Sequence, residues 1–384
     1  MKALTAFAPA SIGNVSLGFD VLGAALAPVD GTKLGDEVEI KAAESFSLKT
    51  VGRFAHKLPG DADSNIVTKC YHYFCEQMEK SGKPTSPVAL TLHKNLPIGS
   101  GLGSSASSIV AAFAALNAFF GNPFDEDTLL IMMGELEGQI SGSVHYDNVA
   151  PCYLGGMTLM AEYKEQIALQ LPVFKNWYWV SCYSGISVST AAARDILPKQ
   201  VSMADTIQFG RQLAVFTDAL YRKDEALAAA MMQDVIAEPY RKALLPKFDE
   251  SRAYAEQNGA LAFGISGSGP TVFAVCDNLQ NAEKINQWLA DNYIQNDTLY
   301  NDYQGYAGWG QTNENVIVNV QSGGFNNFGW NAPFYGFGGF GFNNFGYRGF
   351  NNFGFYDPFY GGFYGNVGFY NPYRFRGFYG YNNF

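Results

Sequence analysis

The sequence feature that most constrains the fold is a glycine-rich segment at residues 93–108, HKNLPIGSGLGSSASS. Residues 88–92 before it alternate as in a strand, and residues 109–120 after it form an apolar, alanine-rich run that predicts a helix. A strand, a glycine loop and a helix start present backbone N–H groups to a phosphate, because glycine accepts positive φ and the helix dipole favours an anion. The sequence therefore predicts a phosphate-binding loop.

The type of loop follows from its residue order. No Gly-Lys-Ser/Thr follows the glycines, and they lack the GxGxxG spacing of a dinucleotide fold. A glycine turn capped by serines would explain a generic Gly/Ser loop. The order Pro-x-Gly-x-Gly-Leu-Gly-Ser-Ser is more specific, and it resembles the phosphate loop of the GHMP small-molecule kinases.

Composition limits the class of protein. A chain of 384 residues predicts two domains with a substantial core. The formal charge of −10 argues against a nucleic-acid partner, which needs a basic face. Five cysteines without a CxxC favour reduced thiols, and no uncharged apolar run is long enough to span a bilayer. We therefore expect a soluble, cytoplasmic protein with no membrane partner.

The rest of the chain divides by pattern. Strands are predicted at 4–8, 36–42, 157–161 and 177–183, two more around a glycine turn within 261–275, and helices at 65–80, 125–138 and 282–293. We place an N-terminal domain at 1–165, a C-terminal domain at 166–320 and a tail at 321–384. The tail is rich in Gly, Phe, Tyr and Asn and repeats Phe-Asn-Asn-Phe-Gly, which predicts disordered low-complexity sequence.

Four segments in order sharpen the resemblance: 14–23, 97–108, 134–151 with the glycine pair 155–156, and 264–271. Together they resemble the homoserine kinases of the GHMP family, from the N-terminus to about residue 295. The closing strand of that family is hard to find in 298–320, so completeness of the C-terminal domain stays open.

The resemblance implies an α+β, two-domain GHMP kinase fold: a ribosomal protein S5-like N-terminal domain and an α/β C-terminal domain, with ATP and homoserine bound between them. It implies ATP-dependent phosphorylation of the L-homoserine hydroxyl, a step in threonine biosynthesis. Two alternatives remain: another GHMP small-alcohol kinase, and a non-enzymatic scaffold that self-associates through the tail. The oligomeric state, a homodimer included, also stays open.

The resemblance also assigns site residues. Ser105 and Glu137 would hold Mg²⁺, and Asn65 would lie near the adenine. The other residues assigned to ATP are Lys94, Pro97, Ile98, Gly99, Ser100, Gly101, Leu102, Gly103, Ser104, Ser105, Ala106 and Ser107. The residues assigned to homoserine are Asn14, Asp20, His145, Thr190, Arg194 and Arg241.

These residue types suit the chemistry. Asp20 can pair the substrate ammonium, and arginines can grip its carboxylate in a fork. Mg²⁺ needs few protein oxygens beside phosphate. Without a P-loop lysine, neutralisation of the phosphates falls to the metal and the loop dipoles, with help from Lys94. Taken singly, however, Arg194, Arg241 and His145 are residue types more often found in ordinary structural or surface roles.

The residue at the position of the catalytic base differs from that of other family members. In mevalonate kinase-like members an aspartate near the glycine pair acts as base, and its place falls here on Asn148, with Asp147 beside it. An amide cannot accept the proton. We therefore take Asn148, Asp147 and Arg194 as the catalytic candidates, and the choice between Asp147 and Asn148 for the base position stays open.

Overall fold

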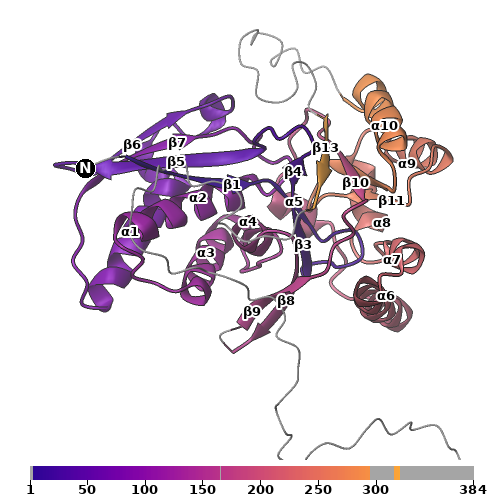
Figure 1. The fold of residues 1–384 in the computed structure, drawn as a ribbon, viewed down its shortest axis with the longest axis horizontal. Helices are drawn as coiled ribbons and strands as arrows, with labels where there is room; N and C mark the ends of the chain where they lie inside the picture. Colours follow the sequence, from indigo (N-terminus) through magenta and orange to yellow (C-terminus); the bar gives the residue numbers. More distant parts are fainter. Residues whose placement is uncertain (1–2, 165, 295–314, 321–384) are drawn as a thin grey trace, which may run out of the picture. The chain divides into compact units, whose positions relative to one another are not determined.

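A computed structural model describes residues 3–164, 166–294 and 315–320 of the chain (Figure 1). The tail predicted at 321–384 lies outside the described residues. The described strands form three sheets, in the orders β1-β5-β7-β6, β2-β3-β8-β9 and β11-β12-β10-β13-β4. The fold is therefore of the mixed α and β class that the sequence predicts.

The first sheet joins the glycine loop to the N-terminal core. Its strands are β1 (Leu4–Pro9), β5 (Gly35–Ala42), β7 (Val88–His93) and β6 (Ser47–Val51). Its helices are α1 (Ile66–Lys80), α2 (Ser104–Phe119), α3 (Glu126–Ser141) and α4 (Val149–Leu154). Figure 1 shows α1, α2 and α3 on one side of the sheet. Side chains such as Val38, Leu90 and Phe113 form the core between them, so the end of β7 and the start of α2 are held in place.

The local sequence explains how the helices beside the site begin. Asn65 caps α1, because its side chain accepts a hydrogen bond from the N–H of Val67 at 3.0 Å. The helix predicted at 65–80 is thus confirmed. Helix α2 begins at Ser104, five residues before the apolar run, so the loop serines form its first turn.

The second sheet consists of β2 (Ser11–Gly13), β3 (Leu22–Ala25), β8 (Met157–Tyr163) and β9 (Gln166–Leu171). Strands β8 and β9 form an antiparallel hairpin. The boundary predicted near residue 165 falls within this hairpin, and it stays a prediction.

The third sheet answers a question that the sequence left open. Its strands are β11 (Ala262–Ile265), β12 (Val272–Cys276), β10 (Tyr178–Cys182), β13 (Asn315–Asn319) and β4 (Ala27–Pro28). Strand β13 pairs antiparallel with β10 and with β4, so a closing strand does lie within 298–320. The sequence left this strand hard to find, and the structure locates it at Asn315–Asn319. The strand is only five residues long, and its partners lie far away in the sequence.

Six further helices complete the described chain: α5 (Thr190–Asp195), α6 (Met203–Arg222), α7 (Glu225–Met231), α8 (Glu238–Arg241), α9 (Phe248–Gln257) and α10 (Leu279–Asn292). Single 3₁₀ turns lie at Ala55–Lys57, Ala62–Ser64 and Lys242–Leu244. The five cysteines are free thiols. Among the described helices, none has the length and apolar character needed to cross a membrane.

Candidate active site

A cavity of about 640 Å³ opens where the glycine loop meets the ends of several elements. Helices α1, α2 and α3 contribute residues on one side of it. The loop before α5, together with Gly267 and Ser268 after β11, contributes residues from the C-terminal half. Residues distant in the sequence therefore share one cavity.

The glycine loop is shaped by positive φ angles. Gly99, Gly101 and Gly103 have φ of 66°, 82° and 62°, which glycine adopts without steric cost. A Cβ on Gly101 would lie 2.4 Å from the carbonyl oxygen of Ser266, and one on Gly103 would lie 2.1 Å from Ser11 Oγ. The prediction that these glycines adopt positive φ is confirmed, and the structure adds that a side chain at Gly101 or Gly103 would clash with neighbouring protein atoms.

The start of α2 provides a candidate metal site. Ser105 Oγ donates a hydrogen bond of 2.6 Å to Glu137 Oε1, and both residues line the cavity. Glu137 is buried, and burial raises the pKa of its carboxyl above the ordinary value. Glu135, two residues earlier on α3, instead accepts a hydrogen bond from Tyr73 and is not among the cavity-lining residues.

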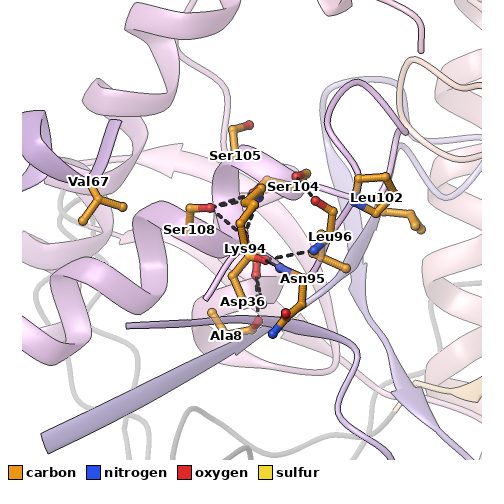
Figure 2. A network of polar contacts seen from close by, with 12 residues as sticks. Ala8, Asp36, Val67, Lys94, Asn95, Leu96, Leu102, Ser104, Ser105 and Ser108 are labelled. Atoms are coloured by element: carbon orange, nitrogen blue, oxygen red, sulfur yellow. Dashed lines mark hydrogen bonds and ion pairs between the residues drawn. The ribbon is translucent and has the colours of Figure 1, made fainter. Parts of the chain in front are cut away.

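Lys94 lies in the cavity wall, but its ammonium group is engaged by the protein. Its Nζ pairs with Asp36 and donates to the carbonyl oxygen of Ser104 at 2.8 Å and to Ser108 Oγ at 3.0 Å (Figure 2). Only 2% of its side chain is exposed. This arrangement does not support the expected help of Lys94 in neutralising phosphates.

Another part of the cavity wall carries charged side chains. The Arg194 guanidinium donates two hydrogen bonds of 2.9 Å to the Asp20 carboxylate. These bonds raise the pKa of Arg194 above its ordinary value, although burial opposes them. Arg241 is buried and donates to the carbonyl oxygen of Gly267 at 2.9 Å. Both guanidinium groups lie over the ring of Phe19, with centroid distances of 5.7 Å for Arg194 and 5.3 Å for Arg241.

The loop that presents Asp20 has an unusual backbone. Asn14, Val15, Ser16 and Asp20 have φ of 68°, 47°, 63° and 58°. A β-branched residue such as Val15 rarely adopts this conformation, and such strain persists only where the surroundings enforce it. Asn14 Oδ1 accepts from the N–H of Asp20 at 3.0 Å, and its Nδ2 donates to the carbonyl oxygen of Gly267 at 3.2 Å. Asn14 thus fixes the position of Asp20.

A third group of polar side chains, His145, Asp147 and Asn148, also lines the cavity. His145 Nδ1 lies 3.0 Å from Asp147 Oδ1, and Ser11 Oγ donates to Asn148 Oδ1 at 2.9 Å. Burial lowers the pKa of His145, but the hydrogen bond and charge of Asp147 outweigh it, so the net pKa is raised. Asp147 and Asn148 both line the cavity, and the choice between them for the base position remains open.

Comparison with known proteins places this site in a family. The family model described as "GHMP kinases N terminal domain" matches residues 65–156, and "GHMP kinases C terminal" matches 216–295. A crystal structure of homoserine kinase from Cytophaga hutchinsonii is 33% identical, with a TM-score of 0.72, over 84% of this chain and 96% of that one. The chain is a GHMP kinase.

Two more distant structures support the fold alone. A putative homoserine kinase from Listeria monocytogenes is 21% identical, with a TM-score of 0.56, and covers 84% of this GHMP kinase and 98% of its own chain. The mevalonate kinase of Methanococcus jannaschii is 15% identical, with a TM-score of 0.57. The match covers 77% of this chain and 96% of the mevalonate kinase chain. The two-domain GHMP kinase fold expected from the sequence is confirmed.

Most of the residues assigned from the sequence lie together in this GHMP kinase. Those that line the cavity are Asn14, Asp20, Asn65, Lys94, Ile98, Gly99, Ser100, Gly101, Gly103, Ser104, Ser105, Glu137, His145, Asp147, Asn148, Thr190, Arg194 and Arg241. Four assigned residues are buried and are not among the lining residues: Pro97, Leu102, Ala106 and Ser107. These four residues therefore lie in the protein interior behind the cavity wall.

The sequence analysis missed other residues at the site. Lys69 on α1, Ser187 before α5 and Ser268 after β11 also line the cavity, and Asp36 lies behind the loop, paired with Lys94. A signal for Asp36 did exist, because a carboxylate in an apolar strand needs a partner. Local patterns gave no corresponding signal for Lys69 or Ser187.

Proposed function

We propose that this GHMP kinase transfers the γ-phosphoryl group of ATP to the hydroxyl of L-homoserine in the cytoplasm, giving O-phospho-L-homoserine for threonine biosynthesis. The observation that carries this proposal is the Asp20–Arg194 pair in the cavity wall. A zwitterionic amino acid brings an ammonium for Asp20 and a carboxylate for Arg194, so it can replace their mutual ion pair with two matched ones. The 33% identity to the Cytophaga hutchinsonii homoserine kinase supports the same substrate.

The glycine loop is the proposed phosphate site. Its backbone and the start of α2 provide N–H groups and the positive end of a helix dipole. Asn65, at the start of α1, lies on the same cavity and is the proposed neighbour of the adenine. Arg241 and Thr190 line the same cavity, where they would hold homoserine together with Asn14 and His145.

Mg²⁺ fits the donor set at the start of α2. A serine hydroxyl and a buried carboxylate lie within hydrogen-bond distance of each other on the cavity wall, and Mg²⁺ prefers such oxygens together with phosphate. Ser105 and Glu137 would hold the ion, which would neutralise charge on the transferring phosphoryl group.

The transfer itself depends on positioning. The homoserine hydroxyl oxygen attacks the γ-phosphorus, the bond to the bridging oxygen of ADP breaks, and the hydroxyl proton leaves late, to the transferred phosphate or to water. Asn148 cannot take this proton, since an amide is no base at neutral pH. Asp147 and His145 hold each other in position beside it.

The test is an ADP-release screen of the full chain with ATP, Mg²⁺ and a panel of small alcohols, corrected for ADP release without acceptor. We expect turnover with L-homoserine and a phosphomonoester product by ³¹P NMR. Turnover with mevalonate and none with homoserine would refute the proposed substrate and favour another GHMP small-alcohol kinase.

A further inference from the structure

We propose that Asp36 and Lys94 form a buried, mutually neutralised pair that positions the phosphate loop, and that Lys94 is not itself a phosphate ligand. This inference deepens the proposed function and rests on its nucleotide site. The pair would hold the loop in place without adding a net charge behind it.

The Asp36 carboxylate, at the beginning of β5, is fully buried. It accepts hydrogen bonds from the backbone N–H groups of Asn95 at 2.8 Å and Leu96 at 3.0 Å, which lead into the loop. It also accepts from Ser108 Oγ at 2.6 Å, beyond the loop on α2, and pairs with Lys94 (Figure 2). One carboxylate therefore holds both ends of the phosphate loop.

All three N–H donors of the Lys94 ammonium group are used in hydrogen bonds within the protein. An ammonium carries three N–H donors, and the protein offers three acceptors: Asp36 Oδ2, the carbonyl oxygen of Ser104 and Ser108 Oγ. A bond to phosphate would require Lys94 to give up one of these partners. Figure 2 shows Ser105, the candidate metal ligand, turned away from this network.

The charge balance of the pair explains why both members are needed. Without Lys94, the Asp36 carboxylate behind the start of α2 would repel the phosphates. Without Asp36, the buried Lys94 ammonium would carry a large desolvation cost. Paired, they leave the helix dipole and the loop N–H groups available for the nucleotide. The backbone of Asn95 and Leu96 stays fixed relative to Ser104, and small displacements of such groups are costly to catalysis.

The test is a double-variant cycle on the full chain: Lys94→Met, Asp36→Asn, and the two combined. The readouts are the Kd of Mg-ADP by calorimetry and the thermal unfolding midpoint. Lys94→Met leaves the Asp36 carboxylate unpaired, so nucleotide binding should weaken about 10- to 100-fold, as for loss of hydrogen bonds to a charged group. The combined variant is neutral again and should recover at least tenfold of that loss.

If Lys94 binds phosphate directly, the combined variant will bind as weakly as Lys94→Met or more weakly, and the proposal is overturned. Should the single variants fail to fold, Ser108→Ala removes one member of the network more gently. It should weaken Mg-ADP binding several-fold, and unchanged affinity would contradict the proposal.

Asn117→Ala is the matched control, because Asn117 is a buried polar residue at the other end of α2, where it holds Phe124. It should lower the unfolding midpoint without changing the Kd. An equal rise in Kd for Asn117→Ala would mean that lost stability alone weakens binding, which would overturn the positioning role. Absence of Mg-ADP binding by the wild type would instead refute the proposed function.

Discussion

The two binding sites proposed for this cavity carry charge in different ways. At the proposed phosphate site, the lysine next to the glycine loop is paired with a buried carboxylate, and the loop presents glycine backbone and the start of α2. A second lysine there, Lys69 on α1, is solvent-exposed. At the proposed substrate site, Asp20 and Arg194 line the cavity as an ion pair with 33% and 31% of their side chains exposed, and the buried Arg241 lines it as well.

This contrast has a physical reason. ATP brings its own metal ion, so its site needs shape and dipoles more than a fixed positive charge. An amino acid brings two opposite charges on one carbon, and it is best recognised by fixed, opposite side-chain charges. Changes at one site should therefore affect one substrate much more than the other.

The largest effect should come from Glu137, the proposed metal ligand. Glu137→Gln keeps the shape of the side chain but removes its charge, so turnover should fall by about two to three orders of magnitude, as for loss of one group that stabilises transition-state charge. Extra Mg²⁺ should restore turnover only in part. Initial rates across a Mg²⁺ titration measure this. Glu135→Gln, on the same helix, is the control. A greater loss of turnover for Glu135→Gln than for Glu137→Gln would mean that Glu135 is the metal ligand.

Gly101→Ala should damage the proposed phosphate site. Its Cβ would meet the carbonyl oxygen of Ser266 at 2.4 Å, at a φ of 82°. Displacing the loop by about 1 Å should lower kcat/KM for ATP about 100-fold, as measured by steady-state kinetics at saturating homoserine. Gly210→Ala is the control, because Gly210 lies within α6 with nothing within 4 Å of an added Cβ. If Gly101→Ala behaves like Gly210→Ala, the loop is not the phosphate site.

Arg194→Ala should damage the proposed substrate site. Losing its charged hydrogen bonds should lower kcat/KM for homoserine about 10- to 100-fold, with little change in the KM for Mg-ATP. An amino alcohol without the carboxylate should lose less than homoserine does. Arg222→Ala is the control, because Arg222 forms an exposed ion pair with Asp218 on α6. Equal losses for homoserine and the amino alcohol would mean that Arg194 does not bind the carboxylate.

The smallest effect concerns stability. Burial raises the pKa of Glu137, so the folded state binds its proton more tightly than the unfolded state, and stability falls as pH rises above about 4.5. Glu137→Gln should therefore raise the unfolding midpoint by about 1 to 3 °C at neutral pH. The gain should shrink as pH approaches 4.5. A gain that stays constant across pH would contradict this charge effect.

Local pattern predicted the elements that carry a clear alternation, cap or turn signal, including β10, whose partners lie far away in the sequence. The strand before the loop, the Asn65 cap and the pair β11–β12 all follow from alternation, cap residues and turn glycines. Strand β13 could not be predicted in this way, because its stability comes from pairing with β10 and β4.

In the candidate site too, local pattern did not predict contacts between residues that are distant in the sequence. The family motif located the loop and its serines, but it gave Lys94 a role that the contacts with Asp36 do not support. The two residues are 58 positions apart, and no local pattern links them. Likewise, the sequence suggested both Asp20 and Arg194 but not that they pair with each other. Long-range ion pairs depend on the fold, and only the structure reveals them.

The central claim, that the two sites act separately, is tested most directly by titrating Gly101→Ala and Arg194→Ala each with Mg-ADP and with L-homoserine in a calorimeter. We expect Gly101→Ala to lose affinity for Mg-ADP about 10-fold or more and to lose much less affinity for homoserine, and Arg194→Ala to show the reverse. Equal losses of both ligands in both variants would contradict this account of the cavity.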